Sequence, residues 1–199
     1  MHRVYAMCLD AAISALLLLP LYLYLNHRYF HDRKRMIGYL LFAIYLSGVF
    51  AVVGLPDIRY VRFAPRYNFR PFAYMFSDWK STVLNVLLFI PMGFCLPLFW
   101  KRFVPFPHAT LFGFFSSLFI ESAQIFTLRA TDVNDLMTNT FGTFLGWCLA
   151  RLVLHLCPKL TPGHRTKEVY VVCGSAVAVM FFLQPYLAAA LWPLFMSKS

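Results

Sequence analysis

The stretch FGFFSSLFIESAQIFTLRATDVNDLMTNTFGTFLGW, from Phe112 to Trp147, decides the fold of this chain. It consists of two apolar segments joined by a short polar turn. Glu121 and Gln124 lie inside the first segment, and Asn139 lies near the start of the second. An ionisable group in the hydrocarbon core of a membrane costs at least about 2.5 kcal/mol. Polar groups in such surroundings therefore indicate either a contact that holds two helices together or a functional site.

The composition of the whole chain places this stretch in a membrane protein. Hydrophobic residues make up 60% of the 199 positions and charged residues 13%, whereas soluble domains average about 45–50% apolar and about 25% charged residues. A membrane-spanning helix needs about 20 apolar residues. We predict six such helices, at about 5–25, 36–55, 81–99, 108–128, 136–156 and 169–191. The predicted fold class is therefore all-α, a polytopic membrane protein with a single integral membrane domain over residues 1–199.

The distribution of positive charge predicts how the chain is oriented. The net charge is +10, and four basic residues fall within the ten-residue connection Asn26–Arg35. Counted over the whole chain with this cluster included, the basic residues are divided almost equally between the two sides. The orientation therefore depends on how dense the cluster is. The positive-inside rule places it in the cytoplasm. Both termini and the polar turn after Phe112 would then face outward.

The long connection at 56–80 combines arginines with aromatic residues. These residues are Arg59, Tyr60, Arg62, Phe63, Arg66, Tyr67, Phe69, Arg70 and Phe72. Such a pattern is compatible with single-stranded nucleic acid. Between two membrane spans, however, a surface segment that contacts lipid phosphates is much the better interpretation. We therefore expect membrane lipids as partners and no nucleic acid.

Helical spacing predicts that the polar residues converge. Glu121 and Gln124 are three residues apart and share one face of a helix. Asp132 suits the N-cap of the next helix, because its carboxylate can accept from free amides of the first turn. The proposed ligand-binding cluster consists of Asn85, Glu121, Gln124, Arg129, Asp132, Asp135 and Asn139. Arg129 lies in the turn, where it can pair with the carboxylates.

Two glycines continue the face that carries Asp135 and Asn139. Gly142 and Gly146 form a GxxxG pair, which lets another membrane helix approach closely. We predict that both glycines serve helix packing.

The residues alone leave a structural and a functional interpretation of the cluster equally open. Buried charges need partners even when they only stabilise packing. A catalytic role is less favoured, because no histidine accompanies Ser116, Ser117 or Ser122 to activate a hydroxyl. A divalent cation on the carboxylates is chemically possible, but a neighbouring Arg129 opposes it. We assign no catalytic residue, metal or cofactor, and favour a protein that is not an enzyme.

Several of these segments resemble the VanZ-like family of membrane proteins. They are NVLLFIPMGF (85–94), SLFIESAQ (117–124), the residues Arg129 and Asp132, and DLMTNTFGTFLG (135–146), with NFRPF (68–72) resembling the approach to the first. The resemblance covers about residues 68–154 and not the first or sixth span. Phe141 and Thr143 depart from the small or aliphatic residues expected there.

The resemblance implies a protein of the cell membrane that lowers susceptibility to teicoplanin or related lipoglycopeptides. The implied partner is a glycopeptide antibiotic or a lipid-linked wall precursor. We interpret the cluster as a site that recognises the polar end of such an amphiphile. Two alternatives remain: an intramembrane enzyme acting on a lipid or lipid-linked phosphate, and a structural partner of other envelope proteins.

Overall fold

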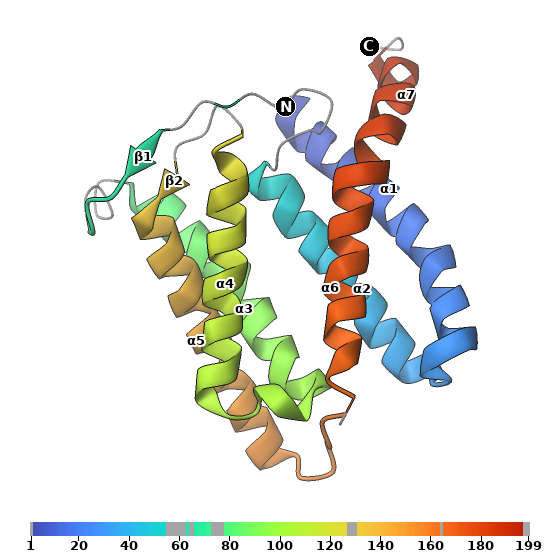
Figure 1. The fold of residues 1–199 in the computed structure, drawn as a ribbon, viewed down its shortest axis with the longest axis vertical. Helices are drawn as coiled ribbons and strands as arrows, with labels where there is room; N and C mark the ends of the chain where they lie inside the picture. The colour runs from blue at the N-terminus through green and yellow to red at the C-terminus, as the bar shows by residue number, and fades with distance from the viewer. Residues whose placement is uncertain are drawn as a thin grey trace. The chain divides into compact units, whose positions relative to one another are not determined.

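The computed structural model describes residues 2–54, 63, 66–72, 78–126, 131–163 and 165–196. Nearly all of the described residues are helical, which confirms the all-α membrane fold class (Figure 1). The chain divides into two compact units. Unit 1 contains residues 1–61 and 168–199, and unit 2 contains residues 62–167. The predicted single membrane domain over 1–199 stays a prediction.

Unit 1 is built from three helical rods. They are α1 (His2–Leu25) with the π-helix η1 (Asn26–Phe30), α2 (Arg33–Val53), and α6 (Lys167–Ala178) with the π-helix η4 (Val179–Leu183) and α7 (Gln184–Met196). In the core of the unit, α1 packs against α2 and α7, and Tyr22 and Phe42 are buried there. The first rod continues to Phe30, so it ends later than the predicted span.

Local chemistry explains where the helices of unit 1 begin, end and change. The Asp32 side chain accepts hydrogen bonds from the backbone N–H groups of Lys34 and Arg35, which starts α2. Gly54 ends α2 in a left-handed conformation with φ 67°. The π-helical turn η4 immediately precedes the segment that contains Pro185, which has no N–H to continue the α-helical pattern.

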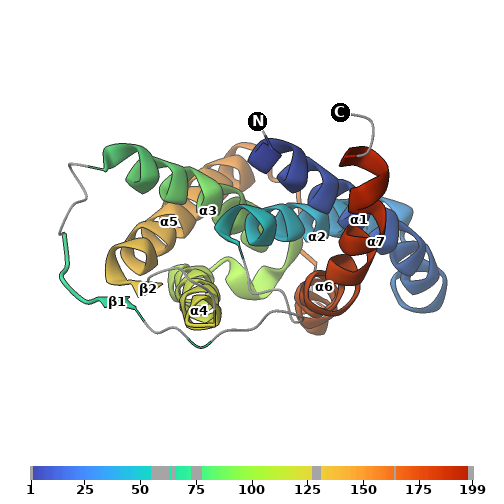
Figure 2. The ribbon, with the colours of Figure 1, turned by 90° about the horizontal axis from the view of Figure 1, so that it is seen from above.

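Unit 2 contains the stretch from Phe112 to Trp147. Its elements are β1 (Tyr67–Asn68), α3 (Trp79–Phe99), the short 3₁₀-helix η3 (Lys101–Phe103), α4 (Phe106–Gln124), β2 (Thr131–Asp132) and α5 (Val133–Leu156). Helix α5 packs along both α3 and α4 (Figure 2). Strands β1 and β2 form a short parallel pair in which Tyr67 lies opposite Thr131. This pair joins the 66–72 segment to the start of α5.

Close backbone contact between α3 and α5 depends on glycine. A Cβ atom at Gly142 would overlap the carbonyl oxygen of Val86, and one at Gly146 would overlap that of Ile90. Gly93 of α3 lies equally close to the Thr143 carbonyl. The two helices can therefore approach only where side chains are missing.

Four of the described helical rods are long and apolar enough to cross a membrane: Leu9–Phe30, Arg33–Val53, Trp79–Phe99 and Lys167–Leu191. Helices α4 and α5 have 19 and 24 residues, so length does not separate them from the others. Both contain polar residues, among them Glu121, Gln124 and Asn139, as α3 contains Asn85. Each of the six predicted spans overlaps a helical rod, but α4 ends at Gln124, before the predicted end at 128. Residues 55, 127 and 128 of the predicted spans lie outside the described residues. The number of helices that cross the membrane stays a prediction.

Candidate functional site

The polar residues meet at the end of unit 2 where α4 finishes and α5 begins. Glu121, in the last turns of α4, is only 3% exposed. One of its carboxylate oxygens, Oε2, accepts the backbone N–H of Asp132 at 2.9 Å. The Thr131 hydroxyl donates to the Glu121 carbonyl at 3.0 Å. The end of α4 is thereby bonded directly to β2.

Asp132 is the N-cap of α5, which confirms the predicted capping role. Its Oδ1 accepts from the backbone N–H of Asn134 at 2.8 Å and from the Asn134 side-chain amide at 2.9 Å. Its Oδ2 accepts from the Asn68 side-chain amide at 2.9 Å. All three donors are neutral, so these bonds leave the negative charge of the carboxylate in place.

Asn134 holds the 66–72 segment at the N-terminus of α5 by hydrogen bonds. Its Oδ1 accepts the backbone N–H of Phe72 at 2.6 Å, and its Nδ2 donates to the Arg70 carbonyl at 3.3 Å. Phe72 has φ 61°, in the left-handed region that non-glycine residues seldom occupy. The Thr131 N–H donates to the Arg66 carbonyl at 2.8 Å at the other end of the segment. The segment is therefore held at both ends.

Helix α3 joins the cluster through Asn85. The Asn85 side-chain amide donates to Oδ1 of Asp135 at 2.6 Å. Both residues are partly buried, and a hydrogen bond to an ionised acceptor is stronger than one between neutral groups. Helices α3, α4 and α5 thus each contribute a side chain to this end of the unit.

Deeper between α4 and α5, Asn139 leaves one acceptor unpaired. Its Nδ2 donates to the Ser117 hydroxyl at 2.9 Å, and both residues are buried. Its Oδ1 is buried and has no hydrogen-bond partner within the described part of the chain. An unsatisfied buried polar atom costs about 1–3 kcal/mol. Such an atom marks a place where a donor from water or a ligand can bind.

The structure joins predicted residues in two places and leaves a third with another partner. Glu121 accepts from the Asp132 backbone and Asp135 accepts from Asn85, whereas Asn139 pairs with Ser117. Gln124 is buried in the last turn of α4 at 5% exposure. Arg129 lies outside the described residues. Whether this arrangement binds a ligand stays a prediction.

Sequence reasoning missed four members of this network: Asn68, Ser117, Thr131 and Asn134. Asn134 is two residues from Asp132, so it falls off the helical face on which the prediction was based. The N-cap position of Asp132 could have indicated Asn134, because an N-cap side chain bonds the backbone amide two or three residues later. Asn68 lies in a non-helical segment, where helical spacing carries no information.

The donor set limits what this arrangement can do chemically. Among the residues that the structure describes, no three His, Cys, Asp or Glu side chains gather in a way that could hold a metal ion. The hydroxyl of Ser117 is paired with an asparagine amide, which cannot take up its proton as a base would. Within the described part of the chain, Oδ1 of Asn139 is a buried acceptor without a partner, so this position suits a ligand that presents an N–H or O–H donor.

Sequence comparisons relate this chain to known proteins. The sequence model of the family described as VanZ/LLP1 matches residues 36–154, which is more than half of the chain. Among curated proteins, the Protein VanZ of Enterococcus faecium is 38% identical over 80 residues. That match covers 40% of this chain and 48% of the relative, so it spans about half of the relative's length. No solved structure matches this chain.

Proposed function

The chain belongs to the VanZ/LLP1 family, and from this premise we propose a protein of the cell membrane that lowers susceptibility to teicoplanin or related lipoglycopeptides. The proposed mechanism is recognition of the polar end of an amphiphile by the cluster at the α4–α5 turn. The amphiphile is the antibiotic itself or a lipid-linked wall precursor.

The observation that supports recognition most is the unpaired Oδ1 of Asn139. A group serving only helix packing is expected to have both ends of its amide paired, since leaving one unpaired is costly. Among the residues that the structure describes, only the donor end of the Asn139 amide has a partner. Asp132 and Asp135, nearer to the start of α5, are only partly buried. A ligand with several donor groups could therefore reach from the carboxylates toward Asn139.

Direct binding tests this proposal. Asn139→Leu combined with Ser117→Ala removes the orphan acceptor together with its hydroxyl partner. Because both partners are replaced by apolar groups, the fold should be little affected. Equilibrium dialysis of the purified protein in detergent micelles would measure teicoplanin binding. We expect the double variant to bind teicoplanin about five- to tenfold more weakly. This loss corresponds to the net free energy of one hydrogen bond.

Ser47→Ala is the matched control, since Ser47 is a buried hydroxyl in α2 that bonds the Ala43 carbonyl. It should bind teicoplanin as the unmodified protein does. Unchanged binding by the Asn139→Leu, Ser117→Ala variant would contradict recognition at this position. Release of phosphate from a lipid-linked precursor by the purified protein would instead identify an intramembrane enzyme.

A structural role is the second candidate, and a specific observation favours it. The described bonds of Asp132 and Asp135 already join β1, α3 and α5. In that case the carboxylates would matter as hydrogen-bond acceptors and their charge would not. Neutral side chains of the same shape at these positions separate the two functions.

A further inference from the structure

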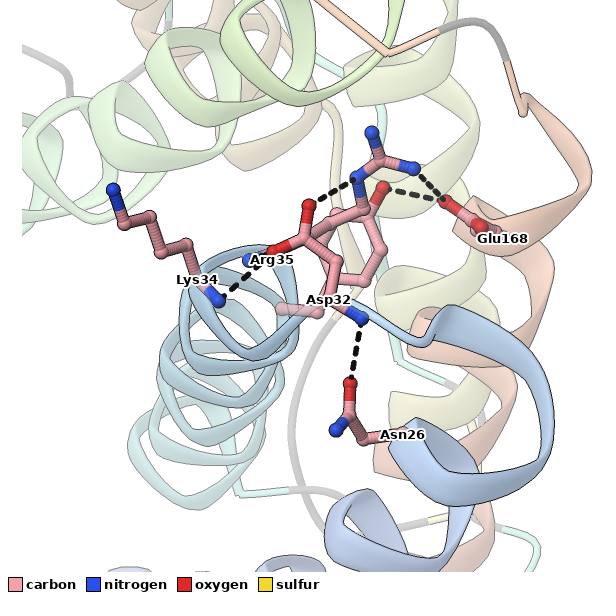
Figure 3. Close-up of polar contacts among 6 residues, drawn as sticks. Asn26, Asp32, Lys34, Arg35 and Glu168 are labelled. Atoms are coloured by element: carbon pink, nitrogen blue, oxygen red, sulfur yellow. Dashed lines mark hydrogen bonds and ion pairs between the residues drawn. The ribbon is translucent and has the colours of Figure 1, made fainter.

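A second polar group lies in unit 1, at the turn between η1 and α2 (Figure 3). The Asp32 backbone N–H donates to Oδ1 of Asn26 at 3.1 Å. The Asp32 carboxylate accepts from the N–H groups of Lys34 at 3.0 Å and Arg35 at 3.2 Å. The preceding residue, His31, has φ 53°. The turn is therefore fixed by hydrogen bonds on both of its sides.

One arginine of the turn is paired within the protein. Arg35 lies between two carboxylates, with Nε 3.9 Å from Asp32 and Nη1 3.9 Å from Glu168 (Figure 3). Glu168 is 8% exposed and also accepts the Tyr39 hydroxyl at 2.7 Å. The carboxylates of Asp32 and Glu168 are thus engaged with Arg35, and this arginine has a structural role.

The other three basic residues of the turn do not pair with these carboxylates. Arg28, Arg33 and Lys34 are exposed, and within the described part of the chain none of them forms an ion pair. In Figure 3 the Lys34 side chain extends away from Asp32 and Glu168. Asp32 already occupies two of the N–H groups at the start of α2. An anion at this turn would therefore bind through side chains.

The position of the turn identifies the anion. It joins two candidate membrane spans, Leu9–Phe30 and Arg33–Val53, so its side chains lie at the boundary between lipid and water. Lipid phosphates occupy this depth, where each basic residue contributes about 1 kcal/mol of attraction to an anionic leaflet. Tyr29, which is 61% exposed, is of the aromatic type enriched at such boundaries.

We propose that this turn is a binding site for the phosphate of an anionic phospholipid, with Arg28, Arg33 and Lys34 as its ligands. The site does not depend on the cluster in unit 2 or on the function proposed for it. Hydrogen bonds hold the backbone of the turn on both sides of Asp32. The three side chains therefore start from fixed backbone positions, which lowers part of the entropy cost of bringing them to one headgroup. Zwitterionic lipids of the same chain length carry a compensating positive charge and are expected to bind less tightly.

Lipid-dependent melting of the purified protein in detergent tests the proposal. Titrations with short-chain phosphatidylglycerol and phosphatidylcholine give an apparent Kd for each lipid. The triple variant Arg28→Gln, Arg33→Gln, Lys34→Gln should lose about tenfold or more in affinity for phosphatidylglycerol. Its affinity for phosphatidylcholine should be unchanged. Equal affinity of the unmodified protein for the two lipids would overturn the proposal.

Three controls make the test specific. Lys101→Gln, Arg102→Gln, Lys159→Gln removes the same charge from three exposed positions of unit 2. None of these residues belongs to the turn, so the affinity for phosphatidylglycerol should stay within about twofold of that of the unmodified protein. An equal loss of phosphatidylglycerol affinity in both triple variants would show that the effect depends only on net charge. Inorganic phosphate should not displace the lipid at equal concentration, and full displacement would identify a free-anion site in place of a lipid site. Arg35→Gln should lower the melting temperature without lipid while preserving the lipid preference.

Discussion

Asp132 determines where α5 begins and where the 66–72 segment lies. The same carboxylate caps the helix through Asn134 and holds Asn68 of β1. Losing an N-cap costs about 0.5–2 kcal/mol, and a stranded amide partner adds to that cost. We predict that Asp132→Ala lowers the free energy of unfolding by about 2–3 kcal/mol. Denaturant unfolding in detergent followed by circular dichroism would measure the loss.

Asp78→Ala is the matched control at the start of α3. Asp78 caps its helix with a single side-chain bond to the Ser81 N–H, 3.4 Å long, and is exposed. Its removal should cost about 0.5 kcal/mol, the lower end for a cap. Equal losses in the two variants would show that Asp132 is only a helix cap.

At the scale of single residues, the sequence predicts interactions between near neighbours in the chain. The capping position of Asp132 follows from the residue type and the helix that comes after it, and the structure confirms it. The role of Asn68 could not be predicted in the same way. Its partner lies 64 residues away, and their contact depends on the pairing of two short strands, which no local pattern encodes.

At the scale of elements, the contact between α3 and α5 depends on glycines that have no room for a methyl group. We predict that Gly146→Ala lowers the melting temperature in detergent, because its Cβ would overlap the backbone carbonyl of Ile90. Packed interiors yield little to such overlap, which typically costs about 1–3 kcal/mol. Gly142→Ala, facing Val86, should behave similarly.

Gly48 provides the control within α2. A Cβ at this position would meet nothing within 4 Å, and alanine is the better helix former by about 1 kcal/mol. Gly48→Ala should therefore leave the melting temperature unchanged or raise it. Stability of Gly146→Ala equal to that of Gly48→Ala would rule out close packing at the α3–α5 contact.

The positions of the helices were predictable because apolar runs of membrane length are strong signals. The residues at which the helices end were less predictable. The first rod passes its predicted end and continues to Phe30 through the π-helix η1. Asn26, His27 and Arg28 are polar, so composition alone ends the span before them. The helix continues because its backbone bonds do not depend on side-chain polarity.

At the scale of the whole molecule, the orientation in the membrane remains a prediction from charge. The basic turn 26–35 is expected in the cytoplasm, and the 66–72 segment is expected outside. In a chain whose native cysteines are replaced, Lys34→Cys should resist an impermeant thiol reagent in intact cells. Phe69→Cys, at a position that is 71% exposed, should react. The reverse labelling pattern would place the cluster on the cytoplasmic side and exclude an outward-facing site.

The central claim is that the cluster recognises a ligand, and neutral side chains of the same shape test it most directly. Glu121→Gln combined with Asp135→Asn keeps a hydrogen-bond acceptor for the Asp132 N–H and for Asn85 while removing two charges. The measurement is the teicoplanin susceptibility of cells expressing this variant, compared at equal membrane abundance and similar melting temperature. We predict a folded protein that no longer protects, so that susceptibility matches that of cells without it. Full protection by the folded variant would contradict the claim and leave the cluster with a structural role.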